Sequence, residues 1–65
     1  MKKSDLIVEN HGTILLLFPA TNAGRSWIGE NIGSDAQRWA GAVVVEPRYI
    51  ADIVIGARAD GLEVR

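Results

Sequence analysis

A chain of 65 residues without a single cysteine has only packing and hydrogen bonding to hold it folded. A domain of this length buries about 60% of the surface that its unfolded chain exposes, so its stability is marginal. The hydrophobic fraction of 48% is typical of a globular chain. We therefore expect one small α/β domain over residues 1–65, with residues 1–5 its least ordered part and a second copy adding to its core.

The charges are nearly balanced, with seven basic and eight acidic residues and a formal net charge of −1. Nucleic-acid binders carry a basic stripe, whereas the arginines here are scattered singly, at Arg25, Arg38, Arg48, Arg58 and Arg65. The longest apolar run, Ile14 to Phe18, is far shorter than the roughly 20 residues that span a bilayer. We expect a cytoplasmic protein that does not bind membranes, and the scattered arginines disfavour nucleic acid as its partner.

The first third of the chain predicts a β-hairpin. Two β-prone runs, 6–9 and 13–18, flank the turn-forming sequence Asn10-His11-Gly12. The second run is apolar at five consecutive positions, which is typical of a strand covered on both faces or lying centrally in its sheet. Pro19 ends this strand because it has no N–H to donate.

A helix is predicted next, capped by Thr21 or Asn22 and running to about Ile32. Its apolar side is formed at helical spacing by Ala23, Trp27, Ile28 and Ile32. Gly33 follows, and we expect it to end the helix in a left-handed conformation.

The second half predicts a strand, a helix and a last short strand. The strand spans residues 39–46, with a bulge or a close backbone approach at Gly41. Pro47 suits the first position of a helix, and Gly61 suits its left-handed end. The apolar stripe of this helix is Tyr49, Ile50, Ile53, Val54 and Ala57. Residues 62–64 alternate as a short strand would.

The resulting order is β-β-α-β-α-β. We predict an α+β fold of the two-layer α/β sandwich type: a small mixed sheet of three or four strands with both helices on one face. The unit from Val43 to Val64 is a strand–helix–strand crossover, so its two strands should run parallel, with a right-handed connection.

The chain also resembles a group of small bacterial and phage proteins. The resemblance covers most of the chain from residue 10 and rests on Asn10-His11-Gly12-Thr13-Ile14, Leu17-x-Pro19, Ala36-Gln37-Arg38-Trp39, Val44-Val45-Glu46-Pro47-Arg48-Tyr49-Ile50-Ala51-Asp52 and Asp60-Gly61-Leu62. It implies a bacterial or prophage origin and brings no catalytic residues, because the group has no established activity.

The residues indicate no catalytic, cofactor-binding or metal-binding site. His11 is the only histidine, and its turn favours an exposed side chain over a general base assisted by Glu9 or Asp5. The glycines do not have the spacing of a phosphate-binding loop, and no metal-binding motif is present. We predict a protein that is not an enzyme and needs no cofactor.

Five residues are candidate partner contacts. Glu46, Arg48 and Tyr49 lie where a strand enters a helix, and the junctions of strands with helix starts are where open α/β sheets bind ligands. Arg38 and Trp39 form the best contact pair, since arginine and the aromatic residues are enriched among binding hot spots. Trp27, on the apolar side of its helix, is assigned to the core.

These observations predict a non-enzymatic protein-interaction module of bacterial or phage origin that self-associates as a homodimer. One alternative is a phage-encoded inhibitor of a host defence system or host enzyme, of the anti-CRISPR kind. A second is a binder of a small ligand or nucleic acid at the junction near Glu46–Tyr49.

Overall fold

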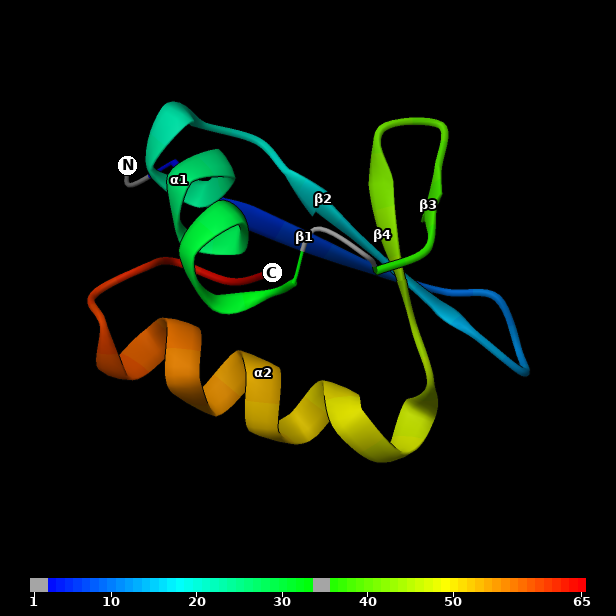
Figure 1. Ribbon diagram of the computed structural model, residues 1–65. Coiled ribbons are helices and arrows are strands. Elements are labelled where there is room, and N and C mark those ends of the chain that lie inside the picture. Colours follow the sequence, from blue (N-terminus) through cyan, green and yellow to red (C-terminus); the bar gives the residue numbers. More distant parts are fainter. Residues whose placement is uncertain (1–2, 34–35) are drawn as a thin grey trace.

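The computed structural model describes residues 3–33 and 36–65. Along this chain the elements are β1 (Leu6–Asn10), β2 (Leu15–Pro19), α1 (Asn22–Asn31), β3 (Arg38–Trp39), β4 (Ala42–Val45) and α2 (Pro47–Ala59), shown in Figure 1. The strands form one sheet in the order β1-β2-β4-β3, and every neighbouring pair is antiparallel. A small α+β fold is therefore confirmed.

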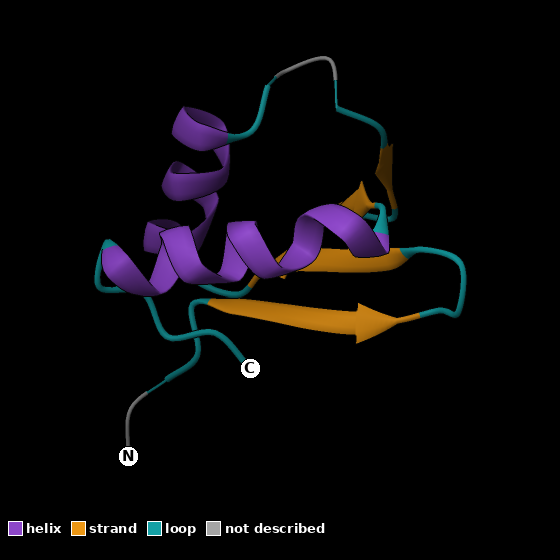
Figure 2. Ribbon diagram, turned by 90° about the horizontal axis from the view of Figure 1, so that it is seen from below, coloured by secondary structure: helices purple, strands orange, loops and turns teal. Residues whose placement is uncertain are grey.

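Both helices pack on one face of this sheet, and their axes cross (Figures 1 and 2). Side chains alternate between the two faces of a strand, so every second residue of β1, β2 and β4 points to the helices. These residues build the buried core together with residues of the helices: Leu6, Leu17, Val43 and Val45 from the strands, and Trp27, Ile28 and Ala57 from α1 and α2. The two-layer arrangement is thus as predicted.

The apolar run 14–18 forms the central strand. β2 pairs with β1 on one side and with β4 on the other. Leu17 is fully buried under the helices, and its neighbour Leu16 is 1% exposed although it points to the opposite face. Apolar residues therefore occupy both faces of the sheet, while the helices cover only one.

The predicted ends of α2 are confirmed. Pro47 is its first residue, and Gly61 follows its end with a φ of +90°. The Gly61 N–H donates to the Arg58 carbonyl, and the Leu62 N–H donates to the Ala57 carbonyl. This pair of hydrogen bonds is a Schellman motif, which satisfies carbonyls that the helix end would leave free.

The segment 39–46 is a hairpin, so the prediction of one strand with a bulge at Gly41 is wrong. Trp39 pairs with Ala42 across a two-residue turn. Both turn residues are left-handed, with φ of +53° at Ala40 and +84° at Gly41, as a type I′ turn requires. An alanine rarely adopts this conformation, which is why the sequence does not signal the turn.

Two further predictions need correction. The prediction that Gly33 ends α1 is wrong, because the helix ends at Asn31 and Ile32 already has an extended conformation. Residues 62–64 form only an isolated parallel bridge between Val64 and Leu6, not a strand. β4 and Val64 both run parallel to β1, as expected for the crossover, but β1 and β2 lie between them.

The start of β1 is joined to α1 and to the last residues. The Asp5 carboxylate accepts hydrogen bonds from the Thr21 hydroxyl at 2.7 Å and from the Glu63 N–H at 2.9 Å. Thr21 also caps α1, since its hydroxyl accepts from the Gly24 N–H. Gly24 itself lies against the Asp5 backbone, where a Cβ atom would clash with the carbonyl oxygen. Met1 and Lys2 lie outside the described residues.

We expect Gly24→Ala to destabilise the fold by about 1–3 kcal/mol or more, because α1 must then move away from β1. The matched control is Gly29→Ala in the same helix, where an added Cβ meets nothing within 4 Å. This control should stabilise the protein by about 0.5–1 kcal/mol through helix propensity. Urea unfolding followed by circular dichroism measures both; equal effects of the two substitutions would contradict the close approach.

We expect Ala40→Asn to stabilise the protein by about 0.5–1 kcal/mol, because asparagine tolerates the left-handed conformation that the turn imposes. Ala40→Val should destabilise it, since a β-branched residue is strained at positive φ. Thermal unfolding of the two variants should give melting temperatures on opposite sides of that of the unmodified chain. If Ala40 instead lay within one continuous strand, Ala40→Val would melt at a higher temperature than Ala40→Asn, because valine favours strands.

Candidate functional site

The sheet has an open face, defined as the face away from α1 and α2. Two rows of paired residues lie across it from β1 to β3. One row is Ile7, Phe18, Ala42 and Trp39, and the other is Glu9, Leu16, Val44 and Gln37. Of these eight residues only Glu9 carries a charge.

Trp39 projects from the open face. Its side chain is 61% exposed, whereas that of Trp27 is 8% exposed and donates its indole N–H to Asp60 at 2.8 Å. The core assignment of Trp27 is therefore confirmed. The two tryptophans have different roles because one lies on the helix-covered side of the sheet and the other stands on the uncovered side.

A groove of about 320 Å³ lies beside the Trp39 indole. Its walls are Trp39, Leu16, Val44 and Ile14, and its polar lining comes from His11 and Gln37. Leu16 is the buried member of this lining. The open face therefore has a projecting indole next to an apolar hollow, a combination that is typical of surfaces that bind a partner.

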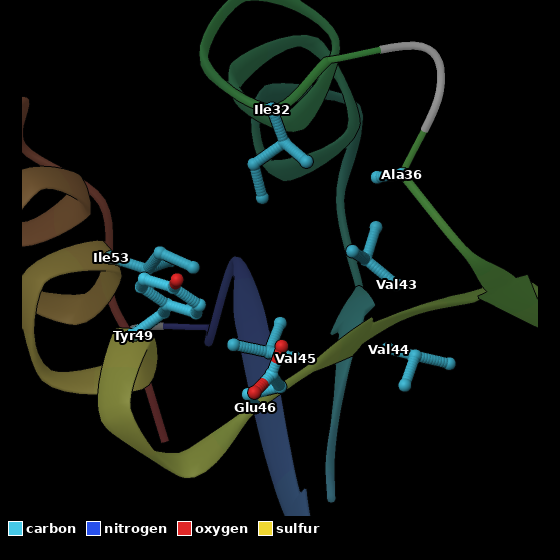
Figure 3. A pocket seen from close by; sticks show the side chains of 8 residues that line it. All are labelled: Ile32, Ala36, Val43, Val44, Val45, Glu46, Tyr49 and Ile53. Atoms are coloured by element: carbon cyan, nitrogen blue, oxygen red, sulfur yellow. The ribbon is translucent and has the colours of Figure 1, made fainter.

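A second hollow of about 290 Å³ lies on the other side of the sheet, between the helices and β4 (Figure 3). We name it the helix-side cleft. Val43 and Val45 point toward it, while Val44 between them points away (Figure 3). Glu46 and Tyr49 are the residues with polar side chains that line it.

The polar groups near the helix-side cleft are engaged with one another. The Arg48 guanidinium lies 3.4 Å from the Glu46 carboxylate and 4.8 Å from the centroid of the Tyr49 ring. The ion pair is exposed and adds little stability, and the arginine over the ring adds a cation–π contact. The structure thus brings these three predicted contacts together at one end of α2.

The other predicted pair, Arg38 and Trp39, is divided between the two faces. Arg38 pairs with Val43, whose side chain lines the helix-side cleft. Trp39 pairs with Ala42 and lines the groove of the open face. Adjacent residues of a strand point in opposite directions, so these two side chains do not form one contact surface.

His11 lies at the rim of the open face. Its Nε2 atom is 3.0 Å from the Glu9 carboxylate, and both side chains are exposed. In the described part of the chain no three histidine, cysteine or acidic side chains gather as metal ligands. Nor is any described helix long and apolar enough to cross a membrane.

Comparison of this chain with models of known protein families, with curated proteins and with solved structures finds no match. The resemblance to small bacterial and phage proteins therefore stays a prediction, and the case for a function depends on the site itself.

Sequence reasoning missed most of the open face, including Leu16, Val44 and Gln37. One signal was available: the consecutive apolar residues of β2 and β4 exceed what a sheet with one covered face requires. What the pattern does not reveal is which face the helices leave uncovered, because that depends on the register of all four strands.

We expect Trp39 to be the tryptophan that water-soluble quenchers reach in dilute solution, because its indole is exposed and that of Trp27 is not. Acrylamide quenching of the unmodified chain should show one accessible and one protected component. The variant Trp39→Phe should lose the accessible one. Equal quenching before and after the substitution would contradict the placement of Trp39.

Proposed function

We propose that this protein is a non-enzymatic protein-interaction module that self-associates through the open face of its sheet. The observation that supports this most directly is the 61% exposed Trp39 indole on an apolar sheet face that no described helix covers. Exposed apolar surface of this kind on a small domain marks a site of association. Tryptophan is also the residue type most enriched among interface hot spots.

The small size of the core supports the same proposal. The buried hydrophobic residues of the described chain number nine, and Leu16 and Ala42 among them belong to the open face. A second copy on that face would bury the apolar residues around them on both sides. Association with the folded chain then adds to its stability by mass action.

The open face also favours a protein partner over a small reactive substrate. Its groove is mainly apolar, and its polar lining consists of an amide and an imidazole that is already paired with Glu9. Such groups orient an apolar partner and accept an indole N–H, but they do not form a nucleophile with its activating base.

Sedimentation equilibrium from low micromolar to submillimolar protein tests the proposal. We expect a reversible dimer for the unmodified chain. Trp39→Ser should raise its Kd by about 30-fold or more, because losing an aromatic hot spot costs about 2 kcal/mol or more. The result that overturns the proposal is a 7.0 kDa species at every concentration.

Ile55→Ser is the matched control for Trp39→Ser. Ile55 is 66% exposed, but it belongs to α2, in the layer opposite the open face. We expect this variant to associate as the unmodified chain does. If both serine variants weakened the dimer equally, general surface hydrophobicity would explain the association and the open face would not be its site.

A further inference from the structure

We infer that the second copy lies face to face with the first, about a two-fold axis parallel to the strands, so that β1 of each copy lies against β3 of the other. This inference rests on the proposed self-association and adds its geometry. It predicts which residues meet across the interface. The sheet edges and the helix layer are compared first as surfaces for a second copy, and the order of residues across the open face then gives the axis.

The edges of the sheet are poorer sites for a second copy than the open face is. Residues 63–65 run beside β1, where the Val8 N–H donates to the Arg65 carbonyl and the Arg65 N–H to the Leu6 carbonyl. The outer edge of β1 is thus already hydrogen-bonded along most of its length. The opposite edge, β3, has only two residues, which is too short for strand addition from another chain.

The helix layer is also a poorer surface for a second copy. The exposed side of α2 carries the charged residues Arg48, Asp52 and Arg58, and its large exposed apolar residues, Tyr49 and Ile55, lie nearly two turns apart among them. Isolated exposed apolar residues are ordinary on protein surfaces. The open face has only one charged residue in its two rows, so its burial costs less.

Each row of the open face fits against a copy of itself that runs in the opposite direction. Rotation about an axis parallel to the strands places the first residue of a row over the last residue of the same row in the other copy. In the first row this puts Trp39 over Ile7 and the large Phe18 over the small Ala42. Large side chains opposite small ones let two sheets interdigitate at their usual separation of about 10 Å.

The second row matches in polarity as well as in size. Its reversal puts Leu16 over Val44 at the centre and Glu9 over Gln37 at both rims. The amide of Gln37 can donate a hydrogen bond to the Glu9 carboxylate. An axis across the strands would instead place β1 against β1, and the two Glu9 carboxylates would lie along the same edge, where they repel.

The size of the face predicts a weak dimer. Four strands at about 4.8 Å spacing and five residues at about 3.4 Å cover roughly 300 Å² in projection. This projected area is well below the roughly 800 Å² per partner that a stable complex buries. We therefore expect a Kd in the micromolar range or above.

Thiol cross-linking tests the geometry, because the chain has no cysteine of its own. The double variant Glu9→Cys, Gln37→Cys is treated with a short bifunctional thiol reagent, since facing sheets stand too far apart for a disulfide. Within one chain these positions are about 14 Å apart, three strand spacings, beyond the reach of such a reagent. We expect a covalent dimer on a denaturing gel and monomer from each single variant.

Both positions are exposed, so the cysteines should leave the fold intact, which circular dichroism checks. Sedimentation of each variant before the reagent is added shows whether it dimerises. A cross-linked dimer of the single variant Glu9→Cys would overturn the axis parallel to the strands, because this cross-link requires β1 of one copy to lie against β1 of the other. A variant that dimerises without any cross-link would overturn the inferred axis and its placement of Glu9 over Gln37, although self-association through the open face would stand. A monomeric unmodified chain would overturn the proposed function itself.

Charge variants at Gln37 give a second measurement that needs no reagent. Gln37→Lys places a cation over Glu9 of the other copy and should lower the Kd several-fold, whereas Gln37→Glu should raise it by a similar factor. In a dimer about an axis across the strands, β3 lies against β3 and Gln37 does not face Glu9. Either variant would then bring two like charges to the same edge of the interface and raise the Kd. A higher Kd for both variants therefore contradicts the inference.

Discussion

The close approach of α1 to the start of β1 is the constraint on which the rest of the structure depends. Gly24 leaves no room for a side chain against the Asp5 carbonyl, and the Asp5 carboxylate joins the cap of α1 to the residues that follow α2. With α1 held there, Trp27 can pack into the core and bond to Asp60 at the end of α2. One short junction thus positions both helices on the same face of the sheet.

Because both helices pack on one face of the sheet, no described helix covers the other face. The small core requires long apolar runs in its central strands, and these runs supply apolar side chains to both faces. Leu16 of the open face is buried, and it lines one groove together with the exposed Trp39. The apolar runs that supply the core of this small domain therefore also supply its uncovered apolar face.

The two hollows of the molecule differ in what they offer. The helix-side cleft is a gap between crossed helices whose charged neighbours, Glu46 and Arg48, are paired with each other. The open-face groove lies beside an exposed indole and continues into a sheet face with one charged residue. Because burial of apolar surface drives association, we propose the open face and not the helix-side cleft as the association surface.

Local sequence determined the hairpin β1–β2, the cap at Thr21, the helix α2 and its Schellman ending, because each depends on residues close in the chain. It also placed Trp27 in the core, while the contact role predicted for Trp39 stays a prediction. It did not reveal the turn at Ala40, where the surrounding pairing imposes a conformation that alanine disfavours. Only the tertiary structure decided that Arg38 and Trp39 point to opposite faces, and that seven residues of four strands form one surface together with Gln37. The reason is that strand register and the positions of both helices are set by contacts between distant segments.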